Sequence, residues 1–340
     1  MTEYLNNQIR PVSSPVPNRG QLAQMERKFG MFLHFGINTF GNVEWSDGTL
    51  PMDIYRPDRI DAKGWVRTAR EAGMNFVVLT AKHHDGFCLW DTDTTRYSVR
   101  YSPNPTDVVA EVAEACRQYG LKLGIYYSLW DRNAVTYKED FEEGYLRYME
   151  QQLKELLGGK YGEVVELWLD GEWDQPRSRW RLEKLYDMVK RLQPNCQFGV
   201  NNTVGEDRDL AEMPEDRYLP VNCLEGDPLR MFPSDFRLRD PHPCRKGDPK
   251  IYTFQGKRYY LPFEMTICSR GNRWFYSEQY KEVPLLNVEE TVESCQVAFD
   301  EKNIVVINMP PNIHGELVKE DVDHLLEIAR KLNLARESEN

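Results

Sequence analysis

The chain has 340 residues, 41% of them hydrophobic, which is enough to bury a substantial core in one large α/β barrel or in two ordinary domains. The formal net charge is −11 and no block of Lys and Arg occurs. The sequence therefore argues against a nucleic-acid partner and favours an uncharged or cationic ligand.

Three further features bear on where the protein works. No stretch approaches the roughly 20 apolar residues of a membrane span, and residues 1–20 hold no apolar segment that could act as a signal peptide. The seven cysteines are odd in number and form no CxxC pair, which favours reduced thiols over a disulfide or zinc framework. We therefore expect a cytoplasmic protein without a membrane partner.

Short apolar runs alternate with amphipathic stretches along the chain. The apolar runs, which predict strands, lie at 31–37, 75–86, 122–130, 164–170, 197–202 and 303–311. The stretches with helical periodicity lie at 61–73, 107–120, 141–159, 180–194, 288–299 and 321–333. At 107–120, for example, Val112 and Cys116 share one helical face. Thr106 or Asp107 can cap the first turn there, and Gly120 can end the helix.

This regular alternation predicts parallel βα units, which fit either an open doubly wound sheet or a barrel. Polar residues near the ends of successive predicted strands decide between the two. They are His34 after the first strand, His83, His84 and Asp85 after the second, Tyr126 and Tyr127 in the third, Asp170 at the fourth, and Asn201 and Asn202 at the fifth. In a (β/α)8 barrel these ends converge on one face, where the active site lies. We therefore predict an α/β fold with a (β/α)8-like, TIM-type barrel.

Residues 203–262 interrupt the pattern. They are rich in Pro, Asp and Arg and show little periodicity, so we predict long active-site loops around the sixth and seventh strands. The sixth strand cannot be placed from the sequence. We predict a single catalytic barrel domain over 1–340, in which residues 1–27 are an N-terminal extension.

The strand at 164–170 ends on a carboxylate. In "VVELWLDGEW", Asp170 follows an apolar run and precedes Gly171, which lets a ligand approach closely. Such a carboxylate can be a nucleophile held in place by the scaffold, or it can cap the next helix or form a loop salt bridge. The convergence of five strand ends favours the functional interpretation.

The adjacent histidines of "KHHDGF" offer two interpretations. In an extended strand His83 and His84 would point to opposite faces, so both can face the barrel interior only if the strand ends before them. A His-His-Asp metal site is disfavoured, because barrel metal sites usually separate their histidines by one residue. Imidazoles that bind sugar hydroxyls fit the pattern better.

Aromatic residues are abundant at predicted loop positions. They are Trp45, Trp90, Trp130, Trp173, Trp274 and Phe275. Any one of them could pack in the core, but aromatic rings together with carboxylates at a barrel mouth are a common sugar-binding combination. No GxGxxG fingerprint, P-loop or GxSxG elbow is present, so specific signals for dinucleotide binding, phosphoryl transfer and serine chemistry are missing.

Several stretches together resemble one known family. They are "KFGMFLHFGINTF", "VEW", "LTAKHHDGFCLWDT", "LGIYYSLWDRN", "ELWLDG", "YYLPFEMTIC" with "RWFY", and "NIVVINMPPNIHGEL". In this order they resemble glycoside hydrolase family 29, the retaining α-L-fucosidases. The resemblance implies a (β/α)8-like barrel and an exo-acting fucosidase that forms a covalent glycosyl-enzyme on fucosylated oligosaccharides or glycosides, with no metal and no cofactor.

The resemblance also implies roles for single residues. It makes Asp170 the nucleophile, and it places the catalytic acid/base, by spacing from the fifth strand, on Glu215. Glu212, Glu225 and Glu264 remain alternatives for the acid/base. The residues expected to surround the fucose are His34, Glu44, Trp45, His83, His84, Tyr126 and Trp274. The segment "SLWDRN" looks like the branch of the family with narrower, linkage-selective substrates.

The chain departs from the family pattern in two places. Family members commonly read Asn-Asp-Arg-Trp after the fifth strand, whereas this chain has "NNTV" at 201–204, so an arginine near the nucleophile is missing. No residues are left for a C-terminal β-sandwich, and a homo-oligomer could cover the side that the sandwich would cover.

Two alternative functions therefore stay open. One is a metal-dependent barrel hydrolase that uses His34, His83, His84 and Asp170. The other is a catalytically inactive relative that binds fucose, which the missing arginine and the unsettled acid both suggest.

Overall fold

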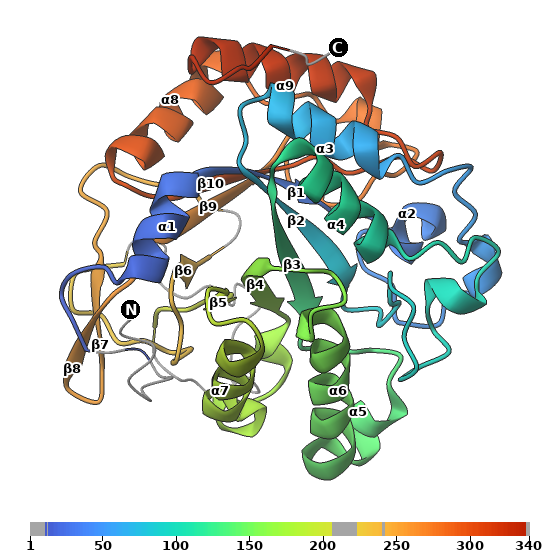
Figure 1. Cartoon of the computed structure of the whole chain (residues 1–340), viewed down its shortest axis with the longest axis horizontal. Coiled ribbons are helices and arrows are strands. Elements are labelled where there is room, and N and C mark those ends of the chain that lie inside the picture. Colours follow the sequence, from blue (N-terminus) through green and yellow to red (C-terminus); the bar gives the residue numbers. More distant parts are fainter. Residues whose placement is uncertain (1–10, 12, 206–222, 240–241, 338–340) are drawn as a thin grey trace.

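The protein is described by a computed structural model that covers residues 11, 13–205, 223–239 and 242–337. Eight strands form one sheet in which every neighbouring pair is parallel. In spatial order they are β5 (Gln197–Val200), β4 (Val164–Asp170), β3 (Lys122–Ser128), β2 (Phe76–Lys82), β1 (Phe29–Leu33), β10 (Ile304–Asn308), β9 (Phe263–Cys268) and β6 (Arg237–Leu238). Figure 1 shows these strands around a common centre, with helices outside them.

The two ends of this strand order, β5 and β6, meet across a short irregular seam. The backbone N–H of Leu238 donates to Thr203 Oγ1 (2.9 Å), and the N–H of Thr203 donates to the Leu238 carbonyl (3.2 Å). The sheet therefore forms a nearly closed barrel, and the predicted (β/α)8-like fold is confirmed.

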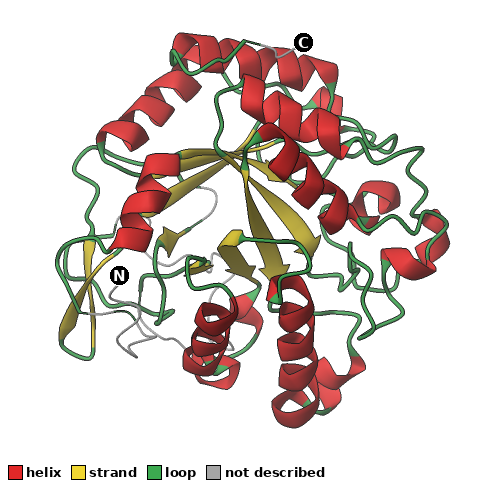
Figure 2. Ribbon diagram, viewed as in Figure 1, coloured by secondary structure: helices red, strands yellow, loops and turns green. Residues whose placement is uncertain are grey.

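Helices cover the outside of the barrel, as Figure 2 shows in red around the yellow strands. The helices that the sequence predicted are α3 (Ala62–Glu71), α4 (Val108–Tyr119), α6 (Leu146–Leu157), α7 (Leu182–Leu192), α8 (Val288–Asp300) and α9 (Lys319–Lys331). Their boundaries follow the expected caps. In α4, the Asp107 side chain accepts the N–H of Ala110 (2.9 Å), and Gly120 ends the helix at a φ of 68°. Two short helices, α2 (Ile37–Gly41) and α5 (Val135–Glu139), were not predicted.

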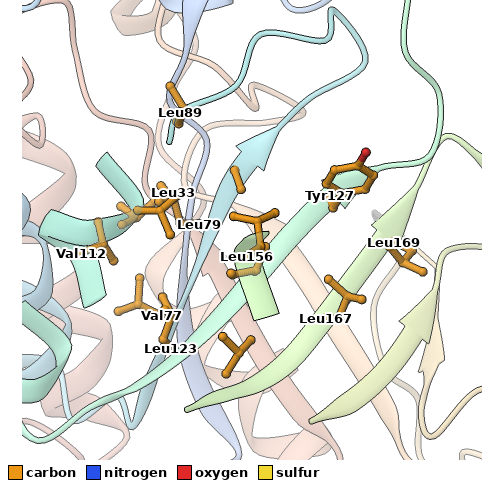
Figure 3. Packing of buried hydrophobic residues seen from close by; sticks show 14 of the residues in the cluster. Leu33, Val77, Leu79, Leu89, Val112, Leu123, Tyr127, Leu156, Leu167 and Leu169 are labelled. Carbon is orange, nitrogen blue, oxygen red and sulfur yellow. The ribbon is translucent and has the colours of Figure 1, made fainter. Parts of the chain in front are cut away.

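The main hydrophobic core lies between the strands and these helices. Figure 3 shows leucines and valines of the strands packed near Val112 of α4 and Leu156 of α6. In β4, Leu167 and Leu169 belong to this outer core, whereas Trp168 belongs to a second cluster inside the barrel. Because side chains alternate along a strand, Asp170 lies on the same inner side as Trp168. The alternation thus points the last side chain of β4 into the mouth of the barrel.

The amino-terminal ends of the strands are closed by α1 (Arg19–Arg27), which lies within the predicted extension 1–27. Gln24 of this helix is buried and its Nε2 donates to Glu166 Oε2 near the start of β4 (3.1 Å). We call this end of the barrel its floor. Asp170 at the carboxyl end of β4 and Glu166 at the floor thus lie toward opposite ends of one strand.

The aperiodic region at 203–262 contains more structure than expected. Its sixth strand, β6, is only two residues long. It also holds an antiparallel hairpin of β7 (Ile251–Phe254) and β8 (Lys257–Tyr260), which is separate from the barrel sheet and was not predicted. Within the described residues, none of the helices combines the length and the apolar character needed to cross a membrane.

Candidate active site

Asp170 lies at the centre of a polar cluster at the carboxyl ends of the strands. Tyr126 Oη donates to its Oδ2 (2.7 Å), and Asn201 Nδ2 donates to its Oδ1 (3.1 Å). His84 Nε2 lies 3.6 Å from Oδ2. Burial raises the pKa of Asp170, and the two hydrogen bonds oppose that rise by stabilising the charged form. The carboxylate is therefore fixed in orientation by neighbouring strands, as a nucleophile requires.

The two adjacent histidines both face this cluster. Strand β2 ends at Lys82, so His83 and His84 lie beyond it and are free of the strand alternation. His84 is hydrogen bonded through Nδ1 to Ser128 Oγ (2.7 Å), and the His83 ring stacks near Tyr126 with centroids 5.6 Å apart. Strand β2 therefore ends before both histidines, as was required for both to face the barrel interior.

These imidazoles are neutral at ordinary pH. Burial lowers the pKa of His34 to about 3 and the pKa of His84 to about 3. Burial also lowers the pKa of His83 well below its ordinary value. His34 is held by a hydrogen bond between its Nδ1 and Asn308 Oδ1 (2.8 Å). Neutral rings with one nitrogen engaged in this way can donate to or accept from a ligand hydroxyl through the other.

Glu44 and Trp274 lie on the same side as His34. The Trp274 ring centroid is 5.0 Å from that of His34, and the Phe275 centroid is 5.4 Å from it. Glu44 Oε2 accepts the backbone N–H groups of both Trp274 and Phe275 (3.0 and 3.1 Å). Glu44 therefore fixes the segment that carries the two rings. The sequence had named Phe275 only as a loop aromatic.

Trp45 belongs to the outer rim of the site. Its side chain is half exposed, and its ring lies 5.0 Å from His84 and 6.1 Å from Trp173, centroid to centroid. Trp130 lies 5.5 Å from His84 on the same measure. All seven residues expected to surround the sugar are thus brought into one connected group with Asp170. The seven are His34, Glu44, Trp45, His83, His84, Tyr126 and Trp274.

The candidates for the acid/base are distributed differently. Glu215 and Glu212 lie outside the described residues. Glu264 is on the floor of the barrel, where it accepts the Trp168 Nε1 proton (2.9 Å), so it lies at the opposite end of the barrel from Asp170. Glu225 is exposed and paired with Arg258 (2.9 Å). Of these two described alternatives, neither contacts the nucleophile.

Glu172 is fully buried beside the nucleophile. Its Oε1 accepts from Asn202 Nδ2 (2.9 Å) and pairs with Arg230 Nη1 (3.2 Å). Burial raises the pKa of Glu172 to about 7, and the charge of Asp170 adds to the rise while Arg230 opposes it. The sequence lacks the family arginine after β5, yet Arg230 supplies a guanidinium to this neighbourhood from the loop that follows. Nothing in the aperiodic sequence around Arg230 signalled this contact.

The residues proposed for a metal-dependent alternative do not form a metal site. Within residues 11, 13–205, 223–239 and 242–337, no three His, Cys, Asp or Glu side chains are placed to hold one ion together. His34 and His84 instead use their Nδ1 atoms in hydrogen bonds with Asn308 and Ser128.

Because of Asp85, which follows the two histidines, the stability of the folded protein should depend on pH. It is buried, its Oδ1 accepts the N–H of Phe87 (2.7 Å), and burial raises its pKa to about 7. In the unfolded chain the pKa is near 3.9, about the model-peptide value. The folded state therefore holds the proton more tightly, and the free energy of unfolding falls as pH rises from about 4 through about 7.

We expect Asp85→Asn to remove this pH dependence. The difference in the free energy of unfolding between the variant and wild type should shift in favour of the variant by about 2 kcal/mol from pH 5 to pH 8. Urea unfolding at both pH values measures the difference, with Asp300→Asn, an exposed aspartate, as the control. An equal effect of Asp85→Asn at both pH values would contradict the expected titration.

The fold is a (β/α)8-like barrel, and its site sets a buried carboxylate among neutral imidazoles and aromatic rings, a combination that suits a carbohydrate ligand. A family model for alpha-L-fucosidase matches residues 17–337. The chain therefore belongs to the alpha-L-fucosidase family, glycoside hydrolase family 29.

Relatives and solved structures agree with this assignment. The chain is 33% identical to alpha-L-fucosidase 1 of Arabidopsis thaliana, over 94% of this chain and 60% of the relative. It is 32% identical to a putative alpha-L-fucosidase 1 of Oryza sativa subsp. japonica, over 92% of this chain and 58% of the relative. It thus spans about 60% of the length of these curated relatives.

Two crystal structures have the same fold. One is a putative alpha-L-fucosidase from Bacteroides thetaiotaomicron, with 27% identity, a TM-score of 0.77, and coverage of 95% of this chain and 69% of that one. The other is a glycoside hydrolase 29 family member from an unknown rumen bacterium, with 26% identity, a TM-score of 0.75, and coverage of 94% and 58%.

Proposed function

We propose that the protein is an exo-acting, retaining α-L-fucosidase that releases terminal α-L-fucose from fucosylated glycans or glycosides. The observation that carries the proposal is the setting of Asp170, a buried carboxylate oriented by Tyr126 and Asn201 next to the neutral His84. Family membership supports fucose as the sugar. We propose that residues 1–340 act as a single catalytic domain.

The reaction takes place in two displacements. Asp170 attacks the anomeric carbon while a general acid protonates the leaving glycosidic oxygen, which gives a covalent fucosyl-enzyme. The same group, now a base, then takes a proton from water, and the water oxygen displaces Asp170 from the anomeric carbon. Retention requires the two carboxyl groups to be about 5–5.5 Å apart.

We propose Glu215 as this acid/base. Of the described carboxylates, Glu172 is the nearest in sequence, but its side chain is fully covered and its Oε1 is engaged by Asn202 and Arg230. A general acid has to reach the leaving oxygen, and the covered side chain of Glu172 supports a different residue in that role. The reaction uses no metal and no cofactor.

The seven residues grouped around Asp170 would supply the contacts to the fucose. Neutral imidazoles of His34, His83 and His84 suit hydroxyl groups, and the Trp274 ring offers an apolar face to the 6-deoxy methyl group. Reduced, buried thiols at all seven cysteines support a reducing compartment, and we propose the cytoplasm. Self-association of the chain stays a prediction.

The direct test is turnover of aryl glycosides by the wild-type protein. We expect cleavage of an aryl α-L-fucoside, with α-L-fucose as the first product observed by NMR, and no cleavage of the matching aryl galactosides. Cleavage of galactosides only would refute fucose as the substrate, and β-L-fucose as the first product would refute retention. Fucose binding without turnover would establish the inactive relative, and loss of turnover with a chelator would establish the metal-dependent hydrolase.

A further inference from the structure

A cavity of about 500 Å³ lies beside the candidate active site. Its walls come from the loop after β3, the short helix α5 and the turns after β4, and they include Trp130, Arg132, Lys138, Glu139, Phe141 and Asp174. We call it the Trp130 cavity. Its volume is in the range of roughly 300–1,000 Å³ that is usual for small-molecule sites. None of the residues already assigned to the fucose contributes to its lining.

The Trp130 cavity and the active site share a wall. The Trp130 ring lines the cavity and also lies 5.5 Å from His84, which contacts Asp170. A Cβ added to Gly171, the residue after the nucleophile, would come within 2.8 Å of Trp130 Cβ. The loop of the nucleophile therefore packs directly against the cavity wall.

A rim of indole rings leads from the active site toward the cavity. Trp45 is half exposed, and its ring is nearly parallel to that of Trp173, with an interplanar angle of 18°. It meets Trp130 edge to face, with centroids 6.3 Å apart. Asp174, the neighbour of Trp173, lines the cavity. The indole rings of Trp45 and Trp130 therefore form a line of contacts between His84 and the cavity wall.

The cavity wall combines apolar faces with polar groups of both signs. Lys138 and Glu139 are exposed and, among the described residues, form no ion pair. The Arg132 guanidinium lies over the Trp130 ring at 4.8 Å and donates to the Ser46 carbonyl (2.9 Å). Asp174 accepts a hydrogen bond from Tyr137 Oη (2.8 Å).

This mixture selects for one class of ligand. A strongly charged ligand would meet like charge on part of the wall, and a purely apolar ligand would desolvate the free charged groups without compensation. A neutral sugar has both hydroxyl donors and acceptors and C–H faces that fit the rings of Trp130 and Phe141.

We propose that the Trp130 cavity is a subsite for a neutral sugar residue on the leaving-group side of the fucosidic bond. The proposal rests on the proposed function. In an exo-acting enzyme the fucose fills the barrel mouth, so any sugar bound beyond the rim belongs to the leaving group. The preferred substrate is then a fucosylated oligosaccharide rather than a small fucoside.

The test compares a long and a short substrate in a variant of the cavity wall. The variant is Lys138→Ala combined with Glu139→Ala, two exposed side chains outside the proposed catalytic group. The matched control is Glu111→Ala with Lys154→Ala, an exposed pair on α4 and α6. The substrates are an aryl α-L-fucoside and two fucosyllactoses, one with fucose on galactose and one with fucose on glucose.

We expect the cavity variant to lose roughly tenfold in kcat/KM on at least one fucosyllactose, through a higher KM, since it removes two side chains that can each form a hydrogen bond with the sugar. The aryl fucoside should be cleaved within about twofold of the wild-type rate, and the control should match wild type on every substrate. Unchanged kcat/KM on both trisaccharides would overturn the subsite. An equal loss on the aryl fucoside would also overturn it, because the effect would then lie in the fucose site.

A binding experiment separates the subsite from the proposed function. Titration of Asp170→Ala with fucosyllactose and with methyl α-L-fucoside should show tighter binding of the trisaccharide, and the cavity variant in this background should lose that advantage. If wild type cleaves none of the substrates, the proposed function fails, while this titration still decides the subsite. Equal affinity for the trisaccharide and the methyl fucoside would refute it.

Discussion

Replacing Asp170 with alanine is expected to lower kcat on an aryl α-L-fucoside by on the order of 10⁴- to 10⁶-fold, the range seen when single residues of a catalytic group are removed. The protein should stay folded. Burial raises the pKa of this carboxyl, so its removal takes away a group that is costly to keep ionised. Steady-state kinetics and a thermal melt of the same preparation measure both effects. Activity within tenfold of wild type would show that Asp170 is not the nucleophile.

Azide gives this variant a second readout. The space left by the carboxylate lies on the side from which Asp170 would attack, so azide should enter it and bond to the anomeric carbon as the aglycone leaves. The product should be β-L-fucosyl azide, identified by NMR. Asp170→Asn is the matched control, because its amide fills the same space and should block the rescue. Formation of the α-azide would instead mark the residue as the acid/base.

Replacing Arg230 with alanine is expected to destabilise the protein by about 3–5 kcal/mol at pH 8. Both side chains of the Arg230–Glu172 pair are almost completely buried, so the variant leaves a carboxylate without its partner. Arg230 lowers the pKa of Glu172, and its loss should raise that pKa further above about 7. At pH 5 Glu172 can then stay protonated, and the cost should be smaller.

Urea unfolding at both pH values measures this loss, and two further variants interpret it. Arg258→Ala removes the arginine of an exposed pair with Glu225 and should cost no more than about 1 kcal/mol. Glu172→Gln in the Arg230→Ala background removes the stranded charge and should recover part of the stability at pH 8. If Arg230→Ala costs no more than Arg258→Ala, the buried pair does not stabilise the fold.

The sequence was informative where local periodicity decides position. The apolar alternation of β4 sends Trp168 and Asp170 to the inner side, and the end of β2 at Lys82 releases His83 and His84 into the same space. Both outcomes depend only on which residues lie on which face of a short strand. For this reason the barrel and the polar side chains at its strand ends could be predicted from the pattern, whereas Glu44, Trp45 and Trp274 were expected only from the family resemblance.

Contacts over long sequence separations could not be predicted in this way. Arg230 reaches Glu172 across 58 positions of mostly aperiodic chain, and β6 consists of only two residues. A strand so short has no pattern to recognise, and no local rule pairs a loop arginine with a distant glutamate. The position of Glu264 could not be predicted either. The sequence kept it as an alternative for the acid/base, but it lies on the barrel floor, away from Asp170.

The neutrality of the buried histidines has a consequence for inhibition. Because His34, His83 and His84 carry no positive charge, the ionised form of Asp170 faces a bound ring without a competing cation on the imidazoles. A fucose mimic with an ammonium in place of the ring oxygen would gain an ion pair in a site of low dielectric. The same negative field that would favour an oxocarbenium-like transition state would hold such a mimic most tightly in the pH range where Asp170 is deprotonated and the amine is protonated.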